Sequence, residues 1–377
     1  MNKQNTEKIF FDHASSERHY EIVPLDVKNV GIFAAFFAQA KGLQPDSPAV
    51  HTAYLKWKYL SPHAAKNCCF ALQHNGAIYA AVGGMISPME INGKVTDICF
   101  PVDWFSHPSN PVKGAGKKIM RALIESYPAS VAVGGSPACF EPQIKVGFKD
   151  VGNVQLLGID EPVKYHLKKI AKFFRNWLKY PLIMWNRTFL QYKAHCQNLS
   201  YARADMCDEE LCRHEGFSML SHCLSRKELV KKWRYFIEQP YNSSHVVRVD
   251  NGGYSSCMLI CKFTDSRKNF CGLADAIIHP RHTPEDILLA AALYARQQHH
   301  SGILIMTNNS GIGQKARETG YRMMMPIRTQ YFSLPEGPSY DKIERFPSVS
   351  LITHDELAYI EGANNRQLRK TCHAGVP

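Results

Sequence analysis

The stretch Asp103-Trp-Phe-Ser-His-Pro-Ser-Asn-Pro-Val-Lys-Gly-Ala-Gly-Lys-Lys-Ile-Met-Arg-Ala-Leu-Ile124 has the pattern of a strand end, a small glycine loop and a helix. Gly114 and Gly116 stand where the backbone must come close to a neighbour, and the loop opens a helix predicted over 117–126. The first amide groups of a helix have no partner within it, so an anion is a natural ligand there. Taken alone, a Gly-x-Gly pair also fits a tight strand-to-helix turn that binds nothing.

Composition limits the classes of protein to consider. The chain has 377 residues, 45% of them hydrophobic, which predicts a globular protein of two domains. Its net charge of +12 favours anionic partners, which include nucleic acid, an anionic membrane surface and a phosphorylated cofactor. Charge does not choose among the three.

The distribution of apolar residues and cysteines predicts a cytoplasmic protein. Residues 1–8 are polar, and the longest apolar run, 30–38, is too short to span a bilayer. The twelve cysteines are scattered, which indicates reduced thiols. One polar segment could in principle bind zinc through Cys207, Cys212, His214, His222 and Cys223. It lacks a Cys-x-x-Cys knuckle, so we expect no metal site.

The first half alternates between strands and helices in a definite order. The predicted elements are a strand (20–25), two helices (27–41 and 51–60), a hairpin (67–74 and 77–86), a second strand pair (88–91 and 95–106), the loop and its helix, a strand (129–133), a helix (138–146) and a strand (151–159). Both strand pairs turn at an Asn-Gly dipeptide. Pro101 predicts a bulge or an edge in the long strand.

This order resembles the GNAT superfamily of acyl-CoA-dependent N-acyltransferases over about residues 20–160. The resemblance rests on His107-Pro108, on the loop Pro111-Val-Lys-Gly-Ala-Gly116, and on the helix end Gln143-Ile-Lys-Val-Gly-Phe148. It implies an α+β fold, with a mostly antiparallel twisted sheet flanked by helices. Two departures stand out. Pro111 replaces the family's Arg or Gln, and Gln143 occupies the place where many members carry a tyrosine that acts as general acid.

The second half repeats the first in a degenerate form. Four segments correspond in order: 54–62 with 230–240, 68–76 with 245–252, 103–108 with 275–280, and 145–148 with 317–321. The second copy has no glycine loop and carries Glu285 and Asp286 at the start of its helix, where a pyrophosphate would be repelled. We therefore expect two tandem GNAT-like folds, of which only the first binds CoA.

The predicted domains are a first GNAT-like domain (1–160), a basic connector (161–200), a degenerate second domain (201–334) and a tail (335–377). The connector has eight Lys and Arg residues and no acidic residue over 163–193, with apolar residues at helical spacing. It is either an interdomain helix with a solvated basic face or a helix at an anionic membrane surface. The second reading implies peripheral contact with the inner face of the membrane.

The resemblance implies a set of residues that bind acetyl-CoA as co-substrate, without a metal. The backbone of the loop would bind the pyrophosphate, and the end of the strand would lie along the pantetheine arm. The residues carried over are Phe105, Ser106, His107, Lys113, Gly114, Ala115, Gly116, Lys117 and Lys118. The aromatic residues Trp57 and Tyr59 are candidates for the acceptor site, with a place in the core as the alternative.

For the proton acceptor we consider Asp103 and His107, both near the strand end. Both residues recur in the second copy, so a shared structural role is the alternative. If water deprotonates the amine, neither residue is needed as the proton acceptor. The expected reaction is transfer of an acyl group, most simply acetyl, to a small-molecule or saccharide amine, with no nucleic acid. Two alternatives stay open: a Fem-like aminoacyltransferase that acts on a cell-wall or polysaccharide precursor, and a non-catalytic binding protein.

Overall fold

The computed structural model describes residues 20–62, 67–107, 113–135, 137–160, 199–206, 208–221, 224–240, 244–251, 253–262, 270–335 and 337–338. It falls into two compact units. The first comprises 1–87, 97–149 and 330–342, and the second comprises 88–96, 150–329 and 343–377. Residues 161–198 of the basic connector, Cys207, His222 and Cys223 lie outside the described residues. Among those described, no helix is long and apolar enough to cross a membrane.

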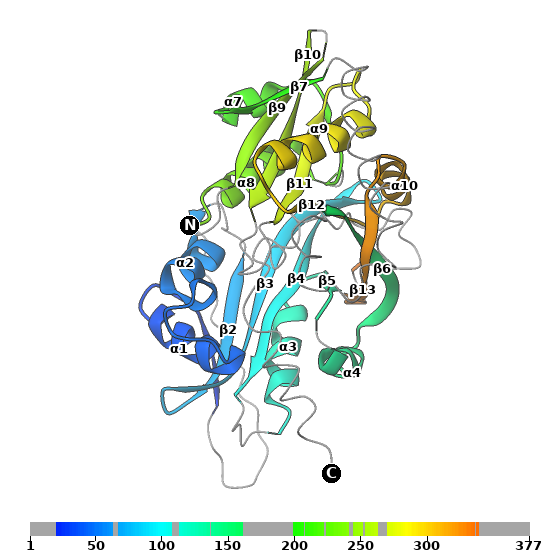
Figure 1. Cartoon of the computed structure of the whole chain (residues 1–377). Coiled ribbons are helices and arrows are strands. Elements are labelled where there is room, and N and C mark those ends of the chain that lie inside the picture. The colour runs from blue at the N-terminus through cyan, green and yellow to red at the C-terminus, as the bar shows by residue number, and fades with distance from the viewer. Residues whose placement is uncertain are drawn as a thin grey trace, which may run out of the picture. The chain divides into compact units, whose positions relative to one another are not determined.

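The first unit is a sheet with helices on both faces (Figure 1). Its elements are β1 (Glu21–Pro24), α1 (Val30–Lys41), the 3-10 turn η1 (Pro48–Val50), α2 (Thr52–Leu60), β2 (Cys68–His74), β3 (Ala77–Ile91), β4 (Lys94–Ser106), α3 (Ala115–Ile124), β5 (Ala129–Val133) and α4 (Pro137–Lys145). The strand order is β1-β2-β3-β4-β5, with the end of β13 (Arg322–Ser333) next to β5. β4 and β5 run parallel, and Ile98 pairs with Ala129.

Both predicted Asn-Gly turns are confirmed. Asn75 and Gly76 have φ angles of 49° and 76°, and Asn92 and Gly93 have 50° and 75°. Two consecutive positive φ angles define the turn that matches the twist of a hairpin. β4 passes through Pro101 without interruption, so the irregularity that we placed at this proline lies two residues further on. Asp103 has a φ of 48° there, a strained conformation for a non-glycine residue within a strand.

Two adjacent glycines of β3 bring helices close to opposite faces of the sheet. A Cβ atom on Gly83 would meet the Tyr59 hydroxyl of α2 at 2.0 Å, and a Cβ on Gly84 would meet Leu123 of α3 at 2.8 Å. Successive residues of a strand face opposite sides, so α2 and α3 cover different faces. On the α3 face, apolar residues of β2, β3, β4, α3 and β5 form one core with Val146 and Phe148, which follow α4.

The second unit repeats this plan. Its elements are β6 (Lys149–Asp160), β7 (Ser200–Ala204), α7 (Asp208–Arg213), β8 (Phe217–Ser218), α8 (Arg226–Ile237), β9 (His245–Asn251), β10 (Tyr254–Lys262), β11 (Phe270–Ile278), α9 (Pro284–Gln297), β12 (Gly302–Thr307), α10 (Ser310–Glu318) and β13. Its strand order is β13-β6-β12-β11-β10-β9-β7, and β8 pairs with β11. The series from α8 to α10 matches that from α2 to α4, which confirms the tandem α+β fold.

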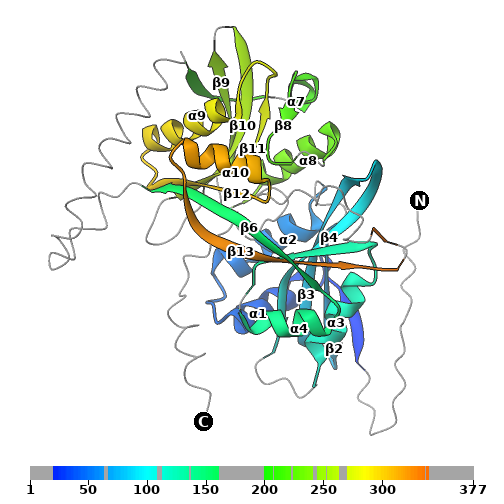
Figure 2. The same cartoon turned by 90° about the vertical axis from the view of Figure 1, so that its right-hand side faces the viewer.

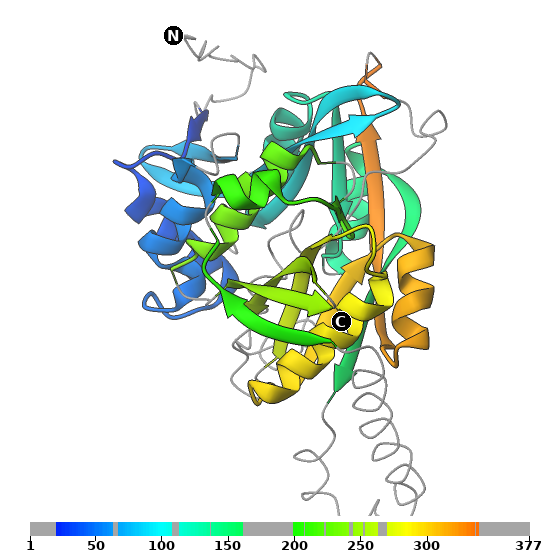
Figure 3. The same ribbon diagram turned by 90° about the horizontal axis from the view of Figure 1, so that it is seen from above.

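Helices cover both faces of this second sheet as well. α9 packs on one face, where it forms the largest part of a core that includes Ile287, Ala291 and Tyr321. α8 lies on the face away from α9 (Figure 2 and Figure 3). The side chain of Trp233 on α8 is fully buried. Residues 286–295 of α9 are all buried, so this helix is enclosed by the unit and does not present a polar face to solvent there.

Candidate functional site

The start of α3 has the properties of an anion-binding helix terminus. Gly114 is the N-cap, with a φ of 81°, and no side chain among the described residues caps the helix. The first turn contains no acidic residue. Lys113, Lys117 and Lys118 are exposed around it. The partial positive charge of the helix start and these three ammonium groups therefore act in the same direction.

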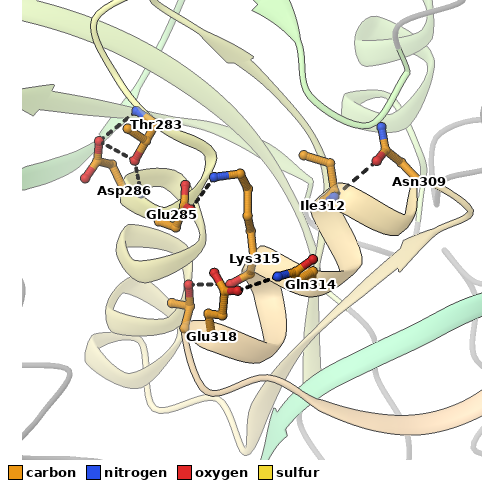
Figure 4. A network of polar contacts seen from close by, with 9 residues as sticks. Thr283, Glu285, Asp286, Asn309, Ile312, Gln314, Lys315 and Glu318 are labelled. Carbon is orange, nitrogen blue, oxygen red and sulfur yellow. Dashed lines mark hydrogen bonds and ion pairs between the residues drawn. The ribbon is translucent and has the colours of Figure 1, made fainter.

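The corresponding helix of the second copy, α9, is already capped. Thr283 accepts a hydrogen bond from the backbone N–H of Asp286 at 3.3 Å, and the Asp286 carboxylate accepts one from the backbone N–H of Thr283 at 2.8 Å. Figure 4 shows this pair and the neighbouring ion pair between Lys315 and Glu285. Because acidic side chains occupy the start of α9, a phosphate group would be repelled there.

The two glycines of the loop have different roles. A Cβ atom on Gly116 would lie 2.8 Å from the Ser106 hydroxyl and 3.3 Å from the Trp104 ring, so Gly116 lets α3 approach β4. Trp104 Nε1 also donates a hydrogen bond to the Gly116 carbonyl at 2.9 Å. Gly114 instead has open space around its Cβ position and needs glycine for its positive φ. Pro111 lies outside the described residues.

Asp103 is the centre of a buried ionic cluster that the sequence did not predict. Its Oδ1 atom is 2.9 Å from Lys41 Nζ, and its Oδ2 atom is 2.9 Å from Lys58 Nζ. The Tyr59 hydroxyl donates a further hydrogen bond to Oδ2 at 2.8 Å. Lys58 is only 1% exposed and Asp103 5%. These contacts hold the strained residue of β4 against the ends of α1 and α2.

The electrostatics of this cluster keep Asp103 ionised. Burial raises the pKa of the Asp103 carboxyl, but the ammonium groups of Lys41 and Lys58 outweigh burial and lower the pKa well below its usual range. A carboxylate with a lowered pKa is a weak base. The geometry therefore favours an anchoring role for Asp103, the structural alternative that its recurrence suggested, over proton acceptance.

Phe105 and His107 lie beside this cluster at the end of β4. The Phe105 ring is half-buried, with Lys41 Nζ 5.3 Å from its centroid and Phe37 at 6.2 Å. His107 is also half-buried, and its backbone N–H donates to the Tyr79 carbonyl at 2.8 Å. Ser106, between them, is exposed. The structure thus brings the predicted strand residues and the α3 terminus together in one unit, while Ala115 is buried in the core.

The aromatic candidates for the acceptor site are buried. Trp57 is 6% exposed and packs on Tyr54, with ring centroids 5.4 Å apart. Tyr59 is 4% exposed and reaches Asp103. Their burial favours the place in the core that the sequence left open. Lys41 and Lys58 are the residues that sequence reasoning missed, and the one signal for them was a carboxylate inside a strand, which needs a cationic partner.

Asp275 of β11, the counterpart of Asp103, has different partners. It accepts hydrogen bonds from Ser218 Oγ at 2.8 Å and from the backbone N–H of Leu220 at 2.9 Å. Burial raises its pKa to about 6, against the lowering effect of these hydrogen bonds. The strand also has a register shift here, opposite Leu259 and Ile260. Both copies therefore have an irregular strand at this position, whereas the ion pairs with Lys41 and Lys58 belong to the first copy.

The described residues contain no group of three or more His, Cys, Asp or Glu side chains that could bind a metal ion. Several cysteines are buried thiols, and burial raises the pKa of Cys261 to about 12 and that of Cys68 to about 11. Thiols with raised pKa values are poor nucleophiles at neutral pH.

No protein-family model matches the sequence, and no curated protein matches it. Solved structures do match the fold. A tandem GNAT protein from the clavulanic acid biosynthesis pathway covers 85% of this chain and 100% of its own, with a TM-score of 0.52 and 13% identity. A GCN5-related N-acetyltransferase from Anabaena variabilis covers 83% and 72%, with a TM-score of 0.51 and 8% identity.

A third similar structure is the glucosamine N-acetyltransferase region of a fungal multi-domain GH3 β-N-acetylglucosaminidase. The match covers 85% of this chain and 39% of that one, with a TM-score of 0.56 and 13% identity. Identities this low carry information about the fold alone. Together with the order of strands and helices, they show that the chain has the tandem GNAT fold.

Proposed function

We propose that the first copy is an N-acyltransferase that transfers an acyl group, acetyl in the simplest case, from acyl-CoA to a primary amine. The observation that carries the proposal is the start of α3. It is free of acidic residues, Gly114 leaves it without a side-chain cap from the described residues, and three lysines surround it. The matching helix α9 has a capping box and two acidic residues in its first turn.

In this proposal the backbone amides of residues 113–117 bind the pyrophosphate, with Lys113, Lys117 and Lys118 adding charge. Phe105, Ser106 and His107 lie along the pantetheine arm. Asp103 maintains the irregular end of β4, where backbone amides would polarise the thioester carbonyl. The amine then attacks that carbonyl directly, the C–S bond breaks, and the protein forms no covalent intermediate.

The proton of the incoming ammonium needs an acceptor. Asp103 is a weak base, for the reasons given above, so water or His107 is the acceptor in this scheme. The thiolate that leaves would take a proton from solvent, because Gln143 has no acidic group. The pH dependence of the acylation rate should therefore show no step from the protonation of Asp103, because this carboxylate stays ionised at the pH values of the assay.

The acceptor to test first is an amino sugar. This choice is motivated by the fungal glucosamine N-acetyltransferase region, one of the similar structures, and it agrees with the saccharide amine expected from the sequence. Small primary amines without a sugar ring form the comparison set. Mass spectrometry of the products would identify the acetylated amine.

Calorimetric titration with acetyl-CoA tests the donor site. Gly114→Glu places a carboxylate at the helix start and should abolish binding. Gly93→Glu is the matched control, because Gly93 also has a positive φ, 75° against 81°, and open space at its Cβ position. It should bind acetyl-CoA as the wild type does.

The outcomes separate the candidate functions. No binding by the wild type, or equal binding by Gly114→Glu, would refute the CoA site. Binding without product from any amine would favour a non-catalytic protein. Turnover with aminoacyl-tRNA but not with acetyl-CoA would favour the Fem-like alternative.

A further inference from the structure

Two buried glutamines of the first unit have polar atoms that the mechanism above does not use. Gln330 of β13 is 1% exposed, and neither Oε1 nor Nε2 has a hydrogen-bond partner among the described residues. Gln143 of α4 is 6% exposed, and its Oε1 has no partner within the described part of the chain. A buried amide without a partner destabilises the folded state, so such groups point to a ligand that supplies one.

Gln330 lies beside the carboxyl ends of β4 and β5, where the candidate site is. β13 is the neighbour of β5, and the backbone N–H of Leu334 donates to the Pro128 carbonyl at 3.1 Å. The end of β13 is thus beside the start of β5, so the two strands are antiparallel and Gln330 lies beside the second half of β5. Since β4 is parallel to β5, the second half of β4, with Asp103 and Phe105, is at the same end.

Both glutamines face the space between α4 and the sheet. Phe332 packs on Phe148 just after α4, with ring centroids 5.8 Å apart. Gln330 precedes Phe332 by two residues and therefore points to the same face of the strand. Val146 follows α4 directly, and its backbone N–H donates to the Pro142 carbonyl at 3.1 Å, so the helical turn continues to this core residue. Gln143 precedes Val146 by three residues and is itself buried, so it lies on the same inner side.

We propose that Gln330 and Gln143 bind the pantetheine arm of the acyl donor through its secondary amides. This inference rests on the proposed function. A primary amide offers both a donor and an acceptor, which match the C=O and N–H of a secondary amide. Pantetheine has two such groups, and an arm that runs along the end of β4 passes the second half of β5. β13, the last strand among the described residues, thereby supplies a binding residue to the first copy.

The test compares acetyl-CoA with adenosine 3′,5′-bisphosphate, which has the nucleotide end of CoA but lacks the arm. Gln330→Leu should weaken acetyl-CoA binding about tenfold to thirtyfold, as expected for one or two lost hydrogen bonds, and leave bisphosphate binding unchanged. The ligand-free variant should melt at the wild-type temperature or higher, since an unpaired buried amide has been removed. Gln143→Leu should weaken acetyl-CoA binding in the same selective way.

Gln239→Leu is the matched control. Gln239 is 5% exposed, its Oε1 and Nε2 lack partners among the described residues, and it belongs to the second unit. Its replacement should leave acetyl-CoA affinity unchanged. If Gln330→Leu does not fold, the unbranched Gln330→Met provides the same comparison.

Four results would overturn the inference. If the wild type binds acetyl-CoA and the Gln330 variants bind it equally well, the role of Gln330 is wrong and the proposed function stands. If the variants lose both ligands to the same extent, or melt at a lower temperature without any change in affinity, the amide is structural. If the wild type does not bind acetyl-CoA, both proposals fail together.

Discussion

Replacing Asp103 by asparagine tests the buried ionic cluster most directly. The substitution keeps the shape of the side chain but removes the charge that compensates Lys41 and Lys58, at 2.9 Å from each. The amide nitrogen also places N–H donors against an ammonium group. Lys58 is only 1% exposed, so water does little to replace the lost partner.

The expected cost follows from the burial of this cluster. Removing one partner of a buried ion pair typically destabilises a protein by about 3–5 kcal/mol, because the other charge stays in the interior. A matched control is Asp150→Asn. Asp150 forms an ion pair with Arg328, and their side chains are 46% and 35% exposed, respectively. Exposed pairs contribute less than about 1 kcal/mol.

Urea unfolding, followed by circular dichroism, measures both free energies. The pKa of Asp103 is lowered in the folded protein, so its stabilisation is complete above the unfolded value of about 4 and is lost as pH falls below it. The deficit of Asp103→Asn should therefore be the same at pH 6 and pH 8. A deficit no larger than that of Asp150→Asn, or one that changes between these pH values, would refute the reasoning.

Three further substitutions test other parts of the structure. Gly83→Ala should cost about 1–3 kcal/mol in urea unfolding, because its Cβ would lie 2.0 Å from the Tyr59 hydroxyl, whereas Gly31→Ala, with nothing within 4 Å, should be neutral or stabilising. Thr283→Ala should lower the unfolding free energy by about 1 kcal/mol through loss of the α9 capping box, and an unchanged midpoint would contradict the cap. Burial raises the pKa of Asp275 to about 6, so the folded protein retains a proton that the unfolded chain releases between about pH 4 and pH 6, and its stability should fall as pH rises through this window. Asp275→Asn should remove that fall, and an identical slope in the variant would contradict it.

Local chemistry made much of the first copy predictable. The Asn-Gly turns fix the hairpins, the alternation of apolar residues identifies β2, and β5 was predicted as a buried strand, which its five buried residues confirm. The glycine loop predicts the start of α3 to within two residues, with Ala115 as the first helical residue instead of Lys117. These features depend on contacts between residues close in sequence, so the sequence of one chain is enough to predict them.

Features that depend on distant residues were not predictable. The contact between Lys58 and Asp103 joins residues 45 positions apart, and a lysine within a helix is normally solvated. The strand β13 was missed because Arg322–Ser333 contains a proline and three methionines and its pairing partners lie in other segments. The burial of Gln330 likewise follows from that pairing and from no local pattern.

The path of β13 has a consequence for synthesis and folding. This strand begins in the second unit and ends in the first, while β6, which follows α4 in the chain, belongs to the second unit apart from its first residue. A ribosome that has released residues 1–160 has therefore not yet made the neighbour that β5 needs. Contacts between residues so far apart in sequence slow folding. The chain between them loses conformational entropy when its ends come together, before the contact itself stabilises the fold. The first unit, although most of it is translated first, acquires β13 only after residues 150–329 have been made, so a stop codon after residue 160 would yield a sheet without β13 and with an exposed edge at β5.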